Sequence, residues 1–121
     1  MTISEILVTN ISVLKYFKNL TYLFLSKNQI TDISVINDLK NLIFLNLSNN
    51  QITDINDLLE LNNLKFLEIS GNKIKNITEL TKMKNLVNLK IDKSQITDNQ
   101  FEKLKSELPN CQIDVMDFKI D

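Results

Sequence analysis

Several residue types that carry chemistry are missing from this 121-residue chain, or nearly so. It has no histidine, and all 14 of its basic residues are lysines, so arginine is absent as well. It contains one cysteine, one glycine and one proline, and its formal net charge is −1. No hydrophobic run approaches the roughly 18 residues that a membrane-spanning helix needs. Each of these shortages excludes or disfavours a class of function.

Without histidine, Ser-His-Asp triads and histidine-ligated metal sites are excluded. Without arginine, the guanidinium groups that bind phosphates and guanine edges in a bidentate way are missing. Gly71 is the single glycine, so no glycine-rich phosphate loop can form. We therefore expect no cofactor, no metal ion, no nucleic acid and no membrane among the ligands.

The lone cysteine and the first ten residues bear on location. Cys111 cannot form an internal disulfide, and it occupies the repeat position that Leu23 and Leu45 hold, which predicts an inert core thiol. Residues 1–10 lack the basic segment and the small-residue cleavage site of a signal peptide. These features predict a cytoplasmic protein. The alternative is a secreted or cell-surface location, if the chain is a fragment or a processed form.

A repeat of 22 residues organises the chain. Leucine begins each unit at five equally spaced positions: Leu20, Leu42, Leu64, Leu86 and Leu108. The spacing predicts four full units over 20–107, namely 20–41, 42–63, 64–85 and 86–107. Residues 1–19 follow the same register as a degenerate N-terminal capping repeat, and residues 108–121 are expected to form a C-terminal capping strand and tail. The whole chain is thus a single domain.

Each column of the repeat predicts a piece of local structure. In the LxxLxL segment the last two leucines alternate with variable residues, which is typical of a short strand with one buried face. An asparagine follows, and its amide can satisfy backbone groups where the chain turns out of the strand. The asparagines of this ladder are Asn28, Asn50 and Asn72. Apolar residues then recur every three positions, which predicts a short 3₁₀ return on the convex side.

The fourth unit departs from this pattern. Ser94 replaces the ladder asparagine, and Thr97–Gln100 matches a capping box at the start of a helix. Phe101 and Leu104 follow at helical spacing, and Pro109 stands behind them as a stop signal. We expect about ten residues of α-helix here, closing the C-terminal end of the domain.

Two units carry a family pattern most fully. They read LTYLFLSKNQITDI from Leu20 and LIFLNLSNNQITDI from Leu42, and both fit LxxLxLxxNxIxDI. They resemble the leucine-rich-repeat family, and within it the 22-residue subclass typified by internalins and by the repeat-containing regulatory subunit of protein phosphatase 1. The resemblance implies an α/β solenoid, a right-handed horseshoe. Its parallel sheet would form the concave face, with short 3₁₀ turns and one C-terminal α-helix on the convex face. Members of the family mostly bind proteins through the concave face.

The repeat also predicts which side chains share that face, because equivalent residues occupy adjacent parallel strands about 4.8 Å apart. The first row is Tyr22, Phe44, Phe66, Asn88 and Asn110. The second row is Phe24, Asn46, Glu68, Lys90 and Gln112, and the third is Ser26, Ser48, Ser70, Asp92 and Asp114. The residues predicted to bind a partner are Tyr22, Phe24, Phe44, Asn46, Phe66, Glu68, Asn88, Lys90 and Asp92.

Four contiguous aromatic residues in outward positions favour a protein-interaction module, an adaptor or an inhibitor of one partner protein. Two other interpretations of these rings are a structural cover for the neighbouring strands and self-association. A further alternative is a structural repeat fragment of a larger surface or adhesin-type protein, with no independent activity. An enzyme is not expected, because the carboxylates of Glu68, Asp92 and Asp114 are spread over two rows and interleave with Lys90.

The last strand and its tail present an unpaired edge that could join two copies. The apolar residues of that region are Val115, Met116, Phe118 and Ile120. We expect a monomer or a weak dimer.

Overall fold

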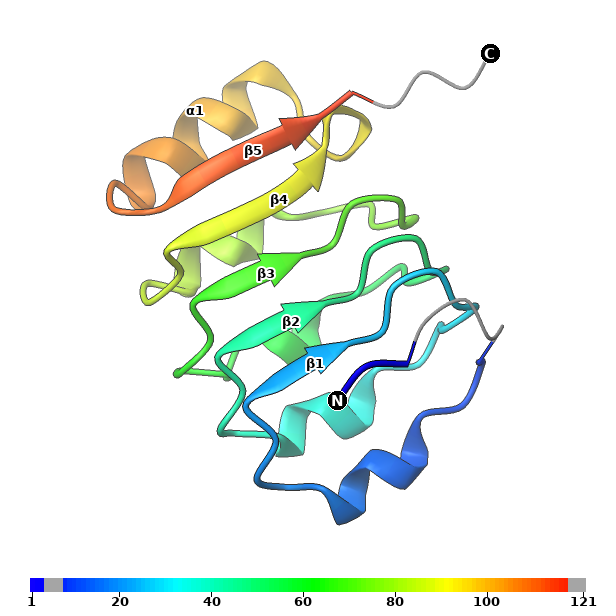
Figure 1. Cartoon of the computed structure of the whole chain (residues 1–121). Helices are drawn as coiled ribbons and strands as arrows, with labels where there is room; N and C mark the ends of the chain where they lie inside the picture. Colours follow the sequence, from blue (N-terminus) through cyan, green and yellow to red (C-terminus); the bar gives the residue numbers. More distant parts are fainter. Residues whose placement is uncertain (4–7, 118–121) are drawn as a thin grey trace.

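The computed structural model describes residues 1–3 and 8–117, so Phe118 and Ile120 lie outside the described residues. Five parallel strands form one sheet in chain order (Figure 1). They are β1 (Tyr22–Phe24), β2 (Phe44–Asn46), β3 (Phe66–Glu68), β4 (Asn88–Asp92) and β5 (Gln112–Met116). A parallel bridge between Thr2 and Phe24 aligns the N-terminal capping repeat with β1 in the predicted register. The expected parallel sheet is confirmed.

The second layer consists of short helical turns that return the chain behind the sheet (Figure 1). Four 3₁₀ turns do this in the N-terminal capping repeat and the first three full units: η1 (Ser12–Tyr16), η2 (Ser34–Asp38), η3 (Asn56–Leu58) and η4 (Thr78–Lys82). A fifth turn, η5 (Lys93–Gln95), follows β4, and α1 (Asp98–Glu107) then supplies ten residues of α-helix. Thr97 caps this helix by accepting the Gln100 N–H at 3.2 Å, and Gln100 Oε1 accepts the Thr97 N–H at 3.0 Å. The predicted helix and its capping box are confirmed.

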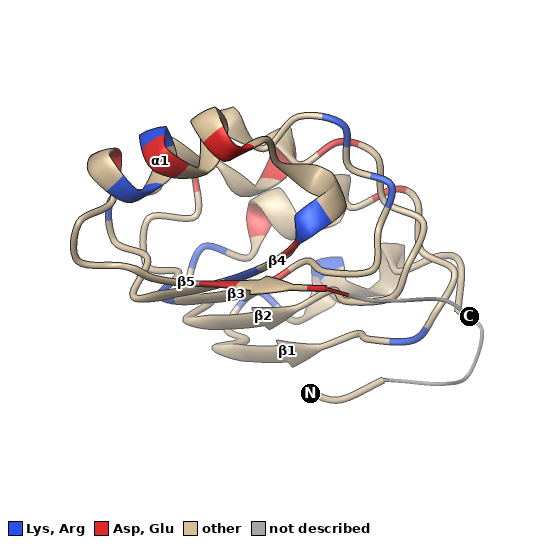
Figure 2. Ribbon diagram, turned by 90° about the horizontal axis from the view of Figure 1, so that it is seen from above, with Lys and Arg blue, Asp and Glu red and all other residues tan. Residues whose placement is uncertain are grey.

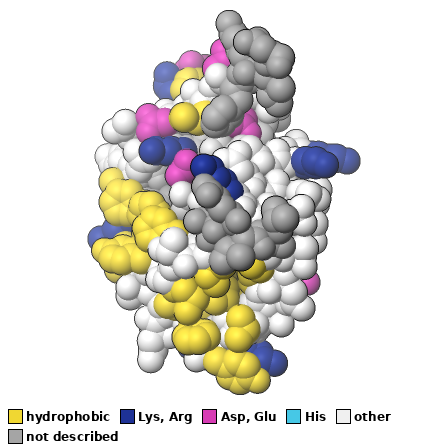
Figure 3. Space-filling model, turned by 45° about the vertical axis from the view of Figure 1, so that its right-hand side comes forward, with side chains coloured by type: hydrophobic (Ala, Val, Ile, Leu, Met, Phe, Trp, Pro, Cys, Tyr) yellow, Lys and Arg dark blue, Asp and Glu magenta, His cyan; other side chains and the backbone are white. Residues whose placement is uncertain are grey.

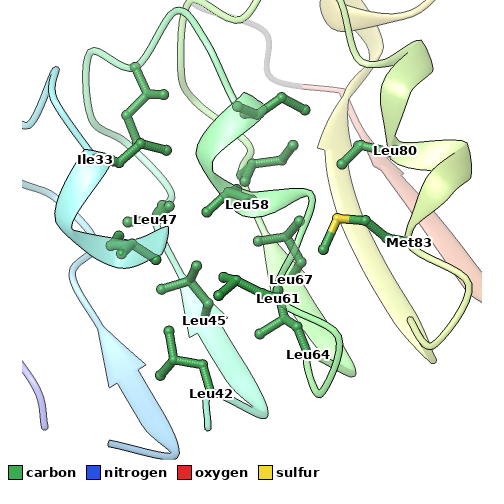
Figure 4. Packing of buried hydrophobic residues seen from close by; sticks show 14 of the residues in the cluster. Ile33, Leu42, Leu45, Leu47, Leu58, Leu61, Leu64, Leu67, Leu80 and Met83 are labelled. Atoms are coloured by element: carbon green, nitrogen blue, oxygen red, sulfur yellow. The ribbon is translucent and has the colours of Figure 1, made fainter. Parts of the chain in front are cut away.

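The hydrophobic core lies between the two layers and is built from stacked copies of the same residues (Figure 4). Leu45 and Leu67 point inward from β2 and β3, where they meet Leu58 and Leu80 from the turns. All four side chains are at most 2% exposed. Because each unit repeats the same inward positions, the core runs through the solenoid as continuous columns.

The predicted asparagine ladder is confirmed and closes the turn after each of the first three strands. Asn50 Nδ2 donates to the carbonyls of Leu47 at 3.0 Å and of Leu25 in the preceding unit at 2.9 Å. Asn50 Oδ1 accepts the N–H of Ile30 at 3.1 Å. Asn28 and Asn72 make the equivalent bonds one unit earlier and one unit later. Each asparagine therefore links its own strand end to the unit before it.

The last strand differs from the predicted register by two residues. Strand β5 pairs Gln112 with Asn88 and Ile113 with Leu89, a separation of 24 residues in place of 22. The return from β4 passes through η5 and the ten-residue α1 in place of a single 3₁₀ turn, which accounts for the extra length. Ile113 therefore occupies the core column assigned to Cys111, and Cys111 lies half-buried before the strand. Its prediction as a core residue was wrong.

Candidate functional site on the concave face

Four aromatic side chains on the first three strands form a stripe across the exposed face of the sheet: Tyr22, Phe24, Phe44 and Phe66, called here the aromatic stripe. The ring centroids of Phe24 and Phe44 are 4.7 Å apart, and those of Phe44 and Phe66 are 5.9 Å apart. Tyr22 meets Phe44 edge to face at 6.3 Å. Tyr22 is 53% exposed and Phe66 is 38% exposed, whereas the two rings between them are half-buried.

The parallel register explains this contact. Tyr22, Phe44 and Phe66 are direct partners on adjacent strands, so the 22-residue repeat stacks the rings side by side. The stacked rings support one another, and Tyr22 and Phe66 stay exposed to solvent. A contiguous exposed apolar patch on a soluble domain commonly marks a binding site.

A hollow of about 230 Å³ adjoins the stripe where the aromatic positions give way to polar ones. Its lining residues are Phe44, Phe66, Leu67, Glu68, Asn88 and Lys90. Glu68 and Lys90 are register partners and both are half-buried, yet among the described residues neither forms an ion pair. One face of the hollow is therefore aromatic, and the other offers a carboxylate and an ammonium group to a ligand.

Asn46 and Asn88 lie on the same face with part of their hydrogen-bonding capacity used. Asn46 Oδ1 accepts from the N–H and the hydroxyl of Ser48, at 2.9 and 2.8 Å. Asn88 Nδ2 donates to a carboxylate oxygen of Asp114 at 3.4 Å. Eight of the nine predicted site residues thus share the exposed face of the sheet, and only Asp92 does not.

Asp92 was predicted to face a partner, but it is only 7% exposed. Its carboxylate accepts the Gly71 N–H at 2.5 Å, and its own N–H donates to Gln95 Oε1 at 2.6 Å. In the preceding units the corresponding N–H groups donate to the backbone carbonyls of Ser48 and Ser70. The Asp92 side chain therefore replaces a backbone carbonyl, and its prediction as a contact residue was wrong.

Three members of the third predicted row, Ser48, Ser70 and Asp92, are buried and do not contribute to the exposed face. Strands β1, β2 and β3 end after three residues, so Ser48 and Ser70 fall in the turns, where they are 5% and 2% exposed. Because β5 is shifted by two residues, Gln112 and Asp114 complete the first and second rows, in the places predicted for Asn110 and Gln112. The face therefore consists of two rows of side chains.

Comparisons with known proteins agree with this architecture. A sequence model of the leucine-rich-repeat family, two copies long, matches residues 18–60. Internalin C2 of Listeria monocytogenes is 28% identical with a TM-score of 0.79, over 99% of this chain and 54% of that one. This chain is an internalin-like leucine-rich-repeat protein. Leucine-rich-repeat domains generally mediate protein–protein interactions and are typically not enzymes.

Two further structures resemble this leucine-rich-repeat protein. A leucine-rich-repeat protein of Leptospira interrogans is 33% identical with a TM-score of 0.75, over 88% of this chain and 28% of that one. Another Listeria monocytogenes internalin is 26% identical with a TM-score of 0.72, over 91% and 34%. The chain thus spans between about a quarter and a half of the length of these proteins. A search of curated protein sequences finds no significant match.

Charge is distributed unevenly over the leucine-rich-repeat sheet. Strands β1 and β2 carry no charged residue, whereas Glu68, Lys90 and Asp114 follow on β3, β4 and β5 (Figure 2).

Within the described residues, no group of three or more Cys, Asp or Glu side chains could hold a metal ion. Over the same residues, no helix is long and apolar enough to cross a membrane.

The thiol of Cys111 lies beyond these rows, in a setting that suppresses its ionisation. Partial burial, and to a smaller extent the charge of Asp114, raise the pKa of Cys111 to about 11. The thiol therefore stays protonated at neutral pH, which makes it a poor nucleophile and metal ligand.

Proposed function

We propose that this leucine-rich-repeat protein binds a protein partner through the aromatic stripe and the adjoining hollow, and that it acts as an adaptor or an inhibitor without catalytic activity of its own. The observation that carries the proposal is the row of stacked, partly exposed rings on a single face. An aromatic side chain buries about 150–250 Å² when it is covered, so the stripe offers the apolar centre of a binding site.

The polar residues beside the stripe support the same proposal. Binding energy concentrates in central aromatic anchors, which are surrounded by polar contacts that exclude water. Glu68, Asn88 and Lys90 stand where such a rim is needed, at the edge of the hollow lined by Phe44 and Phe66. A partner that fills the hollow with an apolar side chain could pair its own polar groups with Glu68 and Lys90.

The alternative function is that of a structural repeat segment of a larger surface or adhesin-type protein. It draws support from length, since the chain spans 54% of internalin C2 and 34% of the other internalin. A passive repeat segment has no need of a particular concave side chain. The two functions therefore differ in their response to substitution of the stripe. The cytoplasmic location stays a prediction.

The test is capture of proteins from a lysate of the source cells, using wild type and a Phe44→Ser, Phe66→Ser variant. A Tyr16→Ser, Phe17→Ser variant is the matched control. It removes two exposed aromatic rings from the N-terminal capping repeat, and neither ring lines the hollow beside the aromatic stripe. Circular dichroism and urea unfolding check that all three proteins are folded.

A protein retained by wild type and by the control, but lost by the Phe44→Ser, Phe66→Ser variant, is the expected result. With that protein purified, we expect its dissociation constant to rise at least about a hundredfold, since two anchor residues are truncated. If all three proteins capture the same set, the stripe is a structural cover for the sheet and the proposal is wrong.

A further inference from the structure

The two ends of the solenoid differ in what they expose. Of the seven large hydrophobic residues that are exposed in the described chain, five fall within the first 22 residues. They are Met1 (40%), Val13 (54%), Tyr16 (74%), Phe17 (42%) and Tyr22 (53%). We call Met1, Val13, Tyr16 and Phe17 the N-terminal face. Figure 3 shows hydrophobic side chains gathered at the lower end of the molecule, where the N-terminal capping repeat lies.

The N-terminal face is hollowed, and core residues are partly open beneath it. A hollow of about 450 Å³ lies between Met1 and the segment 16–22. Ile3, Val8 and Leu20 are only partly buried, whereas their equivalents one unit later, Leu25, Ile30 and Leu42, are 0% exposed. In the interior of the solenoid a preceding unit covers these positions. Within the described residues, the N-terminal capping repeat has no such cover.

The opposite end also leaves part of its core partly open. Its residues carry a net negative charge, whereas those of the N-terminal end carry a net positive charge. Ile113 and Val115 on β5 and Phe101 on α1 are half-buried, and we call these three residues, with Asp114 and Asp117 of the last strand and its end, the C-terminal face. Residues 98–117 contain five carboxylates and two lysines. Residues 1–3 and 8–24 contain two lysines and the terminal amino group but no carboxylate.

Both ends also present a free strand edge that runs in the same direction. Met1–Ile3 lies parallel to β1, where the Ile3 N–H donates to the Phe24 carbonyl at 2.7 Å. β5 lies parallel to β4 at the other end of the sheet. Among the described residues, no strand pairs with the outer edge of either segment. A second copy placed end to end would continue the parallel ladder across both edges.

We propose that the N-terminal face of one copy of this chain docks on the C-terminal face of a second copy, head to tail, so that the units of both chains form one continuous solenoid. Apolar surface meets apolar surface, and the positive end of one copy meets the negative end of the next. Two N-terminal faces brought together would instead oppose Lys15, Lys18 and the amino group to themselves. Because the contact joins two different faces, each pair keeps one free face of each kind, and association continues into longer chains.

The first experiment measures the sedimentation of the purified chain over a range of concentrations. We expect wild type to shift from monomer to dimer and then to higher species as concentration rises. A Tyr16→Ser, Phe17→Ser variant should weaken association at least about tenfold, because it removes the apolar centre of the contact. A Phe66→Ser variant is the matched control and should behave as wild type, since it removes an exposed aromatic ring from the concave face.

A second variant, Asp114→Lys with Asp117→Lys, tests the other face. Reversing two charges at the C-terminal end should weaken association about as strongly, whereas Glu60→Lys, an exposed charge in the middle of the solenoid, should leave it unchanged. Each of the two face variants still carries one intact face, and the two faces are complementary. An equimolar mixture of the face variants should therefore form dimers and stop there, although each variant alone stays largely monomeric.

Recovery of dimers in the mixture supports head-to-tail docking. If the Asp114→Lys, Asp117→Lys variant alone associates as strongly as wild type, the N-terminal faces pair with each other and the proposal is wrong. A wild type that stays monomeric up to millimolar concentration also overturns it. Neither result bears on partner binding, because Phe44 and Phe66 belong to neither end face.

Discussion

The turn after the strand is closed by an asparagine side chain together with a serine carbonyl in the regular units, but by two side chains, those of Gln95 and Asp92, in the fourth. Asn72 donates to the carbonyls of Leu47, Ile69 and Ser70 and accepts the Ile52 N–H, while the Ser70 carbonyl accepts the Asn49 N–H. In the fourth unit Gln95 donates to the Ile69 carbonyl at 3.4 Å, and Asp92 accepts the Gly71 N–H. Because the Asp92 carboxylate makes this bond, the Asp92 backbone continues β4, which pairs over five residues with β5. The regular units bond to the preceding unit through the asparagine ladder, whereas the fourth unit has a longer strand that pairs with the last strand of the sheet.

Breaking the ladder in its middle should have the largest effect. Asn50→Ala leaves the buried N–H of Ile30 without a partner. The Leu25 carbonyl and the Leu47 carbonyl each accept two asparagine bonds, and each loses one of them. We expect a loss of about 3 kcal/mol in the free energy of unfolding, measured by urea denaturation. Asn63→Ala is the control: it removes an exposed bond to the Lys40 carbonyl and should cost less than about 1 kcal/mol. Similar losses for both variants would contradict the structural role of the ladder.

The corresponding change in the fourth unit should be milder. Asp92→Ala removes the acceptor of the Gly71 N–H, and we expect about 1–2 kcal/mol less stability by the same measurement. Asp92→Asn keeps an acceptor oxygen in place and should recover most of that loss. If Asp92→Ala has the same free energy of unfolding as wild type, the bond to Gly71 does not stabilise the fold, and the two kinds of unit do not differ in how their turns are stabilised.

The smallest effect concerns the chemistry of a single thiol at the end of the sheet. Since the pKa of Cys111 is raised to about 11, the rate of its alkylation should climb through pH 10–11. At pH 8 only about one thiol in a thousand is ionised in the folded chain. In urea the thiol should titrate near its ordinary pKa, about 8.5, and react much faster. Equal rates in the folded and unfolded chains at pH 8 would show that the thiol is freely solvated.

The sequence predicts those parts of the fold that are repeated. Each core column, the asparagine ladder and the pairing of Tyr22 with Phe44 rest on positions that recur every 22 residues, and the structure confirms them. The capping box over Thr97–Gln100 is a strong local signal and also holds. Parts of the fold that occur once could not be predicted in this way.

Two such parts escaped prediction. The two-residue shift of β5 follows from the longer return through α1, and no later unit repeats it to reveal the new register. Asp92 continues a period-two pattern that predicts an outward side chain. However, its carboxylate accepts the Gly71 N–H, and this bond holds the side chain in the turn. Ser94 stood in the ladder position, and only the structure shows that the neighbouring Gln95 replaces the asparagine.

The ladder has one more consequence, for how such a chain changes its length over generations. Every ladder bond across units in the described chain joins residues 20 or 25 positions apart, so the ladder connects each unit only to its immediate neighbours. Duplicating or deleting one 22-residue segment of the coding sequence would recreate the same bonds at the junction. The chain could thus gain or lose one position in each concave row at a single genetic step, with both ends unaltered.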